Sequence, residues 1–488
     1  MLLAILLVPV LAGLLAFILH SATQQRALLL LTAVIHAALT GAVWRRPPAA
    51  LLDGWIALDP VGRLVLTLTS TLFLACAVYS VGYLRQEAQT GVRPDFQERF
   101  TFANAPDARF VGAMALFLAA MSVVAMAQHL GLLWVAIEAT TLASAPLIFF
   151  HRHRRSLEAL WKYVIVCSVG IALALLGNYA FSIASQTLDG VPLLVPALAA
   201  HAADLSRPWL RAGFIFLLVG YGTKMGLAPM HTWLPDAHSE APSVVSALLS
   251  GALLNCAFLG IWRGYLVLAA AGDREFAGDL LILLGLLSLG IAAIFLVRQA
   301  DFKRMLAYSS VEHMGLLAIG IGVGGAGISG AFLHAVNHSL TKAALFLVAG
   351  NILTRFQTKS TDQVRGVLDE MPVSGALWVA GVLAITGLPP FGVFISKLAI
   401  LKATFDGGAT AIGVAMLVAL AMVFIGMTAT ALRMAQGASA HPTAAGQRET
   451  VWSVTPPLVL LLATAVLGLY VPGALTRIFT TAATLGGN

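Results

Sequence analysis

The sequence predicts an all-α polytopic membrane protein with about 14 transmembrane helices, arranged as two inverted five-helix repeats with discontinuous helices 7 and 12. Of its 488 residues, 59% are apolar and only 10% are charged, and the mean hydropathy is +0.89. Soluble domains carry about 25% charged residues. The apolar runs are about 18 to 28 residues long, which is typical of spanning helices and not of barrel strands. Two of the longest runs contain prolines near their middle.

The predicted spans divide the chain into four segments. Residues 1–109 hold three helices and a loop, 110–268 a first repeat, 277–436 a second repeat, and 437–488 a loop followed by the last helix. The first apolar run has no basic segment before it and no small-residue cleavage site, so we expect a retained helix. The spans are predicted at 2–20, 26–44, 62–84, 110–127, 130–150, 160–186, 210–238, 242–268, 277–297, 304–324, 328–354, 373–404, 408–436 and 452–476.

The basic residues predict the orientation. With the N-terminus placed outside, seventeen of the 29 Lys and Arg fall in loops on one side and eight on the other. Basic loops stay in the cytoplasm. We therefore expect a multi-pass protein of a bacterial or archaeal cytoplasmic membrane, with both termini outside and a flexible cytoplasmic loop at 437–451.

The sequence offers no ligands for a cofactor. Its three cysteines are isolated within apolar runs, and neither a CxxC pair nor a phosphate-binding glycine loop is present. The basic stretch at 151–155 is best explained as a loop on the cytoplasmic side, because nothing near it could read or stack on bases. We expect no cofactor on this chain, and any redox chemistry would occur on partner subunits that carry metal or iron–sulfur centres.

Two helices combine a break with a buried lysine. Lys224 lies one turn before Pro229 in the seventh span, and Lys397 follows Pro390 in the twelfth. Proline interrupts a helix, and a break in lipid survives only where protein or water satisfies the freed backbone groups. The motif Gly-Leu-x-Pro begins at Gly226 and again at Gly387, an offset of 161 residues, which indicates an internal repeat.

Glu138 is an acid in the middle of the fifth span. Intramembrane ionisable groups usually mark an ion or proton path. A carboxylate near Lys224 would retain its charge, and protonation elsewhere would then alter the attraction between the two side chains. A static buried ion pair is the alternative interpretation.

Histidines form a second polar cluster. His334, His338 and Lys342 recur every fourth residue and share one helix face, and His313 lies in the span before them. Histidine titrates near neutral pH and can pass protons along such a face. Zinc binding by the histidines would need a third ligand, which the sequence does not supply, and a polar face between packed helices is the other alternative.

Three further residues follow the break in the seventh span. Asp236, His238 and Glu240 lie near its cytoplasmic end and are candidates for proton uptake from that side. Solvation of a helix end explains them equally well.

With these motifs the chain resembles the antiporter-like membrane subunits shared by respiratory complex I, Mrp-type cation/proton antiporters and membrane-bound hydrogenases. Within that family it is most similar to the component-F subunits of hydrogenase-4 and formate-hydrogenlyase-type complexes, on the segments 151–163, 167–175 and 247–256. The resemblance implies fourteen helices and a Glu138–Lys224 ion pair. It also implies a central polar axis at His334, His338 and Lys342, and an outward exit at Lys397. Many relatives have a lysine at the position of Asn255, which can organise water but cannot hold a proton.

The resemblance implies a non-catalytic, proton-translocating subunit of an oxidoreductase complex of the NADH:quinone oxidoreductase or hydrogenase kind. Its partners would be other membrane subunits, soluble redox subunits and lipid, and nucleic acid is not expected. The implied relay comprises Glu138, Lys224, Asn255, His313, His334, His338, Lys342 and Lys397. Two alternatives are a subunit of an Mrp-type Na⁺/H⁺ antiporter and a membrane scaffold that does not transport.

Overall fold

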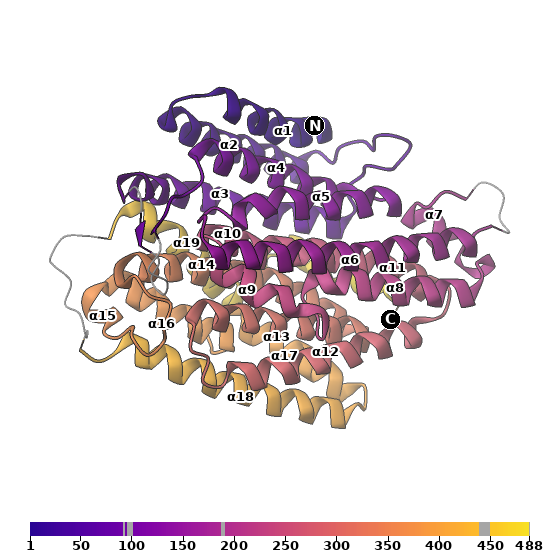
Figure 1. Ribbon diagram of the computed structural model, residues 1–488. Helices are drawn as coiled ribbons and strands as arrows, with labels where there is room; N and C mark the ends of the chain where they lie inside the picture. The colour runs from indigo at the N-terminus through magenta and orange to yellow at the C-terminus, as the bar shows by residue number, and fades with distance from the viewer. Residues whose placement is uncertain (91–92, 95–100, 187–190, 439–448, 488) are drawn as a thin grey trace.

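The protein is a bundle of long helices that run roughly side by side (Figure 1). The computed structural model describes residues 1–90, 93–94, 101–186, 191–438 and 449–487. Within these residues, strands occur only as a two-residue pair, β1 (Arg93–Pro94) with β2 (Thr101–Phe102). The predicted all-α class is therefore confirmed.

The helices follow one another with short connections. In chain order they are α1 (Leu2–Ile18), α2 (Ala22–Arg45), α3 (Pro60–Thr90), α4 (Asp107–Met126), α5 (Leu130–Ile148), α6 (Arg154–Ala184), α7 (Val195–Ala200), η1 (Ala202–Asp204), α8 (Arg207–Met225), η2 (Met230–Thr232), α9 (Trp233–Glu240), α10 (Ser243–Leu248), η3 (Leu249–Leu253), α11 (Leu254–Ala270), α12 (Arg274–Leu296), α13 (Phe302–Val323), α14 (Ala326–Phe356), α15 (Val367–Glu370), α16 (Pro372–Thr386), α17 (Gly392–Asp406), α18 (Thr410–Ala435), α19 (Val451–Leu469) and α20 (Gly473–Leu485).

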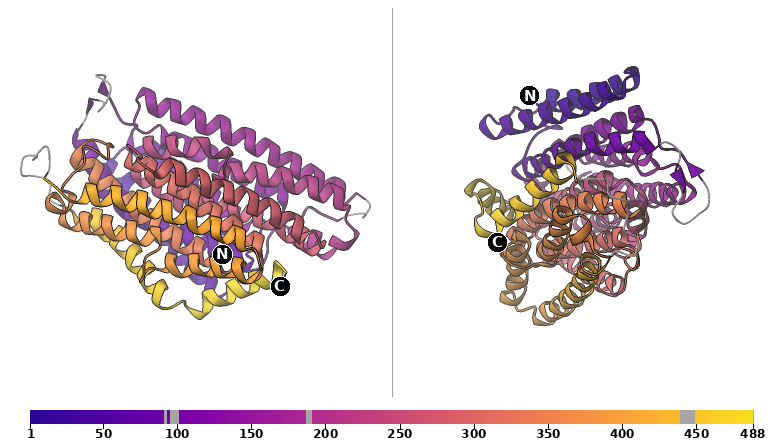
Figure 2. Two further views of the ribbon diagram at one scale, coloured as in Figure 1. Left: turned by 90° about the horizontal axis from the view of Figure 1, so that it is seen from below. Right: turned by 90° about the vertical axis from the view of Figure 1, so that its left-hand side faces the viewer.

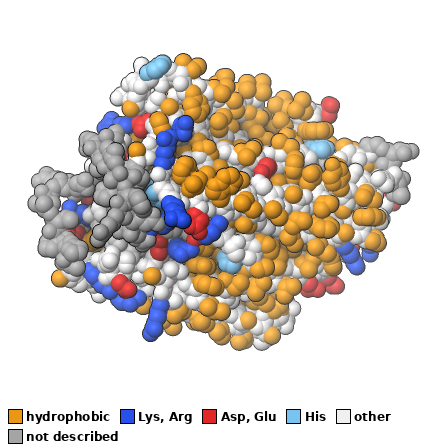
Figure 3. Space-filling model, in the orientation of Figure 1, with side chains coloured by type: hydrophobic (Ala, Val, Ile, Leu, Met, Phe, Trp, Pro, Cys, Tyr) orange, Lys and Arg blue, Asp and Glu red, His pale blue; other side chains and the backbone are white. Residues whose placement is uncertain are grey.

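The bundle presents an apolar surface suited to lipid. Eleven helical segments among the described residues are long and apolar enough to cross a membrane, and α1 and α16 are shorter apolar helices. Large apolar side chains such as Trp161, Ile165 and Val169 on α6 are more than half exposed. Figure 3 shows a broad hydrophobic band, with most of the visible Lys and Arg gathered at one end. We call this the basic end, where α6 begins and α14 ends, and the other the distal end.

Small residues allow α6 and α8 to approach closely. Gly177 faces Gly213 across the interface, and a Cβ on Gly220 would lie only 2.6 Å from the backbone nitrogen of Ala174. Membrane helices have no hydrophobic driving force between them, so close backbone packing at small residues is a main source of their attraction. This contact positions the last turn of α8, which carries Lys224.

The prolines interrupt both helices in which the sequence predicts a break. α8 ends at Met225 and α16 ends at Thr386, and the glycines that follow them, Gly226 and Gly387, have left-handed backbones with φ of 82° and 97°. The bonds Ala228–Pro229 and Pro389–Pro390 are cis. Each helix resumes after the break, as α9 and α17 respectively. A π-helical turn, η3, also lies within the predicted eighth span.

One connection differs from the sequence-based prediction, and another lies largely outside the described residues. The predicted last span at 452–476 is wrong at its end: α19 stops at Leu469 and a separate amphipathic helix, α20, follows. Pro472 is the N-cap residue of α20, which begins at Gly473. The predicted flexible loop at 437–451 falls largely on residues 439–448, which lie outside the described residues.

Replacing Gly220 with alanine should destabilise the protein by about 1–3 kcal/mol, because the new methyl group would force α6 and α8 apart. Thermal unfolding of the purified protein in detergent, followed by size-exclusion chromatography, measures the loss. Gly290→Ala on α12 is the matched control, since in the described part of the chain no neighbouring side chain or other helix lies within 4 Å of the place that a Cβ would take there. Equal midpoints for the two variants would contradict the close-packing account.

Candidate functional site

Lys224 is the centre of the first buried cluster. Its side chain is fully buried at the end of α8. The Nζ atom donates hydrogen bonds to Thr141 Oγ1 at 2.9 Å and to Tyr163 Oη at 2.6 Å. It also lies 4.4 Å from the centre of the Tyr163 ring and 5.9 Å from that of Trp233. Hydroxyl groups and aromatic faces thus replace the water that an ammonium group would otherwise need.

Glu138 is linked to Lys224 through a hydroxyl group. Its carboxylate accepts hydrogen bonds from Thr141 Oγ1 at 3.1 Å and from Ser168 Oγ at 2.8 Å. The implied direct ion pair is not formed, because these two described residues do not come within the 4.0 Å of an ion pair. Thr141 accepts from the lysine and donates to the carboxylate, so it connects the two charges in one directed chain.

Glu138 also faces the outside of the bundle. Its side chain is only partly buried. It shares a helix face with Val135, three residues earlier, and Leu142, four residues later, which are 53% and 63% exposed. The carboxylate therefore lies at the edge of the apolar surface and not at the centre of the protein.

Lys397 belongs to a second buried cluster. Its Nζ forms a 2.7 Å ion pair with Glu312 Oε1 and a 3.3 Å hydrogen bond to the carbonyl oxygen of Thr386, at the end of α16. Glu312 is fully buried on α13. The sequence-based prediction omitted Glu312, although an acid inside an apolar span beside His313 is the same signal that singled out Glu138.

The histidines continue from this ion pair. His313 Nδ1 lies 2.8 Å from His334 Nε2, and His334 Nδ1 lies 2.9 Å from Ser396 Oγ. The Ser396 hydroxyl donates to the carbonyl oxygen of Val393, so its oxygen accepts from His334. The proton of a neutral His334 is thereby assigned to Nδ1, and His313 donates to its Nε2. His313 Nε2 lies 3.8 Å from the Glu312 carboxylate, so the chain of contacts returns to the ion pair of Lys397.

The region between the two clusters is polar and buried. Asn255 donates to Ser339 Oγ at 2.6 Å and to the carbonyl oxygen of Gly251 at 2.8 Å, within the π-helical turn. Both ring nitrogens of His238 and of His338, together with Tyr221 Oη and the Asn255 amide oxygen, lack a partner in the described part of the chain. Buried polar atoms without protein partners are uncommon and are usually bonded to water.

Lys342 and His238 lie beside this polar region. Lys342 Nζ donates to the carbonyl oxygen of Leu306 at 2.6 Å, and the side chain is fully buried. The fully buried His238 ring stacks on Phe346 at a centroid distance of 4.9 Å. Of the three predicted uptake residues, His238 therefore points into the interior.

Asp236 and Glu240 instead belong to the charged surface of the basic end. Asp236 pairs with Lys162 at 2.9 Å and with Arg304, and Glu240 pairs with Lys359 at 2.8 Å. Both acids line a hollow of about 880 Å³. The predicted uptake residues thus divide into two acids at the surface and one histidine inside.

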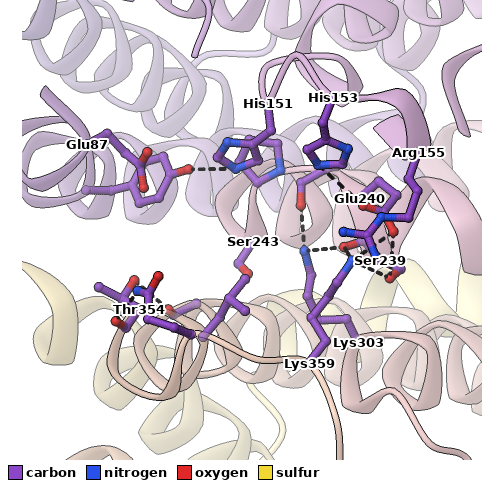
Figure 4. Close-up of a pocket in the computed structure, with 16 residues that line it drawn as sticks. Glu87, His151, His153, Arg155, Ser239, Glu240, Ser243, Lys303, Thr354 and Lys359 are labelled. Atoms are coloured by element: carbon purple, nitrogen blue, oxygen red, sulfur yellow. Dashed lines mark hydrogen bonds and ion pairs between the residues drawn. The ribbon is translucent and has the colours of Figure 1, made fainter. Parts of the chain in front are cut away.

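A neighbouring pocket of about 660 Å³ reaches deeper into the basic end. Figure 4 shows Lys303 and Lys359 approaching Glu240 and Ser239 from one side of it. Lys303 is almost fully buried, and its Nζ donates to the carbonyl oxygens of Ser239 at 3.2 Å and Ala241 at 2.5 Å. A cation at these carbonyls stabilises the C-terminal end of α9. Within the described residues, no group of three His, Cys, Asp or Glu could hold a metal ion.

Comparisons with known proteins point to one family. The sequence signature of the family described as "NADH:quinone oxidoreductase/Mrp antiporter, TM" matches residues 127–426. The chain is 40% identical over 352 residues to a hydrogenase-4 component F homolog of Methylacidiphilum infernorum, covering 71% of this chain and 72% of that protein. It is 28% identical to hydrogenase-4 component B of Escherichia coli, covering 74% of this chain and about half (53%) of that protein.

Solved structures share the fold over almost the whole chain. A chain of the Mrp complex from Dietzia superposes with a TM-score of 0.84 at 21% identity, covering 100% of this chain and 97% of that one. A chain of an archaeal membrane-bound sulfane sulfur reductase gives a TM-score of 0.84 at 20% identity, covering 99% and 97%. A chain of respiratory complex I from Thermus thermophilus gives 0.75 at 25% identity, covering 96% and 97%.

Removing one member of the Lys397–Glu312 pair should destabilise the protein more than removing both. Lys397→Met or Glu312→Gln alone leaves a buried group without its partner, which typically costs about 3–5 kcal/mol, whereas the double variant leaves neither charge. A double-mutant cycle on thermal stability in detergent measures the coupling.

Lys402→Met on the same helix is the control for that cycle, because Lys402 is 71% exposed and, among the described residues, pairs only with Asp406, one turn away. Strictly additive effects of Lys397→Met and Glu312→Gln would contradict the pairing.

Proposed function

This chain belongs to the family of membrane subunits shared by NADH:quinone oxidoreductases and Mrp antiporters, and we propose that it translocates protons as a subunit of a larger redox complex. One observation carries the proposal: two buried lysines, each linked to a carboxylate, lie at opposite ends of a buried polar region. Lys224 connects to Glu138 through Thr141, and Lys397 connects directly to Glu312. Intramembrane charges of this kind are rare and usually functional.

In the proposed path, protons are taken up at the basic end near Asp236 and Glu240 and reach Lys224. They cross through water held by Tyr221 and Asn255 to His338 and the His313–His334 pair, with Lys342 beside the path. They leave by way of Lys397 toward the distal end. The lysines and histidines accept and then donate a proton, and the water bridges the atoms that lack protein partners in the described part of the chain.

The free energy of a buried ion pair is large enough to drive a proton against the membrane potential. Moving one charge against 100 mV requires about 2.3 kcal/mol, and making or breaking a buried ion pair changes the free energy by several kcal/mol. If the complex separates Lys397 from Glu312, the lysine loses its stabilising partner and releases its proton. If the contact reforms, the charged lysine is stabilised again.

The partners proposed are further membrane subunits and soluble redox subunits, with no cofactor on this chain and the metal or iron–sulfur centres on the partners. The name of the similar protein from Methylacidiphilum, a component of a hydrogenase, supports a redox complex. Glu138 supports a membrane neighbour, since a partly exposed carboxylate at the edge of an apolar face favours a polar partner there.

The finer architecture is proposed on the same basis. We infer fourteen spans, with inverted five-helix units at 110–268 and 277–436 that each contain one broken helix. The basic end would face the cytoplasm and both termini the outside of a bacterial or archaeal cytoplasmic membrane, because basic loops stay in the cytoplasm. Lipid would cover the remaining apolar surface.

Lys224→Ala and Lys397→Ala should each abolish proton pumping by the assembled complex while leaving its electron transfer measurable. Both changes remove a buried group that holds the transferred proton. The measurement is acidification inside proteoliposomes that contain the gently solubilised complex, whose subunits are identified by mass spectrometry. Lys402→Ala is the matched control on α17. Pumping at the wild-type rate in both buried-lysine variants would reject the relay.

Thr141→Val should slow pumping by about tenfold, whereas Thr141→Ser should retain most of it. Valine has the shape of threonine but lacks the hydroxyl that connects Lys224 to Glu138, and a hydrogen bond to a charged group contributes about 1.5–3 kcal/mol. The same proteoliposome assay measures both variants. Identical rates for valine and serine would show that the hydroxyl is not part of the path.

The same preparation distinguishes the alternative Na⁺/H⁺ antiporter. The Mrp complex that shares the fold keeps this alternative open. If proton movement required sodium on the opposite side and no redox subunit copurified, the antiporter function would replace the one proposed.

A further inference from the structure

A groove at the distal end is independent of the proton path. It has a volume of about 560 Å³ and lies between the C-terminal end of α2, the start of α3, and α20. Its lining includes Trp44, Arg63, Arg477, Ile478 and Thr481, and we call it the distal groove. Figure 2 shows the C-terminal segment, in yellow, at the surface of the bundle, and α20 packs against α3 and α14.

The distal groove carries positive charge without an acidic partner. In the described part of the chain, no carboxylate lies within 4.0 Å of the guanidinium groups of Arg63 or Arg477, or of Arg45 and Arg46 at the end of α2. The Nε atom of Arg63 is also buried without a hydrogen-bond partner. Cations of the basic end, by contrast, pair with acids, as Lys359 does with Glu240. An anion in the distal groove would satisfy the two arginines that line it.

One of these arginines is held in place by an aromatic ring. The guanidinium carbon of Arg63 lies 4.5 Å from the centre of the Trp44 ring. Trp44 in turn donates from Nε1 to Thr67 Oγ1 at 2.9 Å, which fixes the ring. A stacked guanidinium keeps its planar set of donors free at the edge, and that geometry matches a phosphate group.

The depth of the groove indicates a lipid and not a soluble anion. α2 ends at Arg45 and α3 begins at Pro60, so the groove lies where membrane-spanning helices leave the hydrocarbon. Tryptophan is enriched at this depth. A second hollow of about 860 Å³ runs along α2, lined by Ala38, Gly41 and Ala42 below the arginines, and its small apolar surface suits an acyl chain. We propose that the distal groove binds the phosphate headgroup of an anionic phospholipid.

The test is native mass spectrometry of the full chain, with any subunits that remain bound, after release from detergent. Phosphatidylglycerol is the anionic probe, phosphatidylcholine the zwitterionic lipid and glycerol 3-phosphate the soluble headgroup. Wild-type protein should retain phosphatidylglycerol in preference to the other two. Arg63→Gln and Arg477→Gln should each weaken that binding by about tenfold, since each removes a charge-assisted hydrogen bond.

Arg207→Gln, an exposed arginine at the same end of the bundle, is the control for the change in net charge and should bind as wild type does. Equal retention of phosphatidylcholine and phosphatidylglycerol, or unchanged binding in Arg63→Gln and Arg477→Gln, would overturn the proposal. Equally tight binding of glycerol 3-phosphate would identify a site for soluble phosphate instead. Loss of a partner subunit from the two variants with unchanged lipid binding would assign the groove to an acidic side chain of that subunit.

Discussion

The structure depends on how charged groups are kept stable in a region that excludes water. An isolated lysine deep in a membrane would be strongly destabilised. Lys224 is stabilised by two hydroxyl groups and two aromatic faces, whereas Lys397 is stabilised by a direct contact with Glu312. Both lysines lie beside a helix break. The close packing of α6 against α8 positions Lys224, and the carbonyl oxygen of Thr386 at the end of α16 positions Lys397.

The two clusters differ in a way that matters for coupling. Lys397 and Glu312 touch, so a change in their separation acts on the charge directly. Lys224 and Glu138 act through Thr141, and Glu138 lies at the outer surface of the bundle. A neighbouring subunit that changes the environment of Glu138 would therefore influence Lys224 through a single hydroxyl group. This arrangement gives a membrane partner access to the first cluster, while the second remains enclosed.

Much of this arrangement could be predicted from sequence because ionisable residues are conspicuous in apolar spans. Glu138, Lys224, His334 and Lys397 were identified in this way, and the prolines marked the broken helices. Hydroxyl groups give no comparable signal. Ser and Thr in membrane helices commonly bond to their own backbone, so Thr141 was missed, and Tyr163 was missed because tyrosine is common near the ends of membrane helices. Residue spacing in the sequence does not determine how the helices pack. It therefore could not predict that Glu138 and Lys224 lack a direct contact, or that a π-helical turn forms beside Asn255.

In the proposed relay, water connects the two clusters through the polar interior. The most direct measurement is a high-resolution electron cryomicroscopy map of the chain within its complex in a lipid nanodisc. We expect ordered water between Tyr221, Asn255 and His338, within hydrogen-bond distance of the atoms that lack partners among the described residues. A well-resolved map in which apolar side chains close this region, with no water between Lys224 and the histidines, would contradict it.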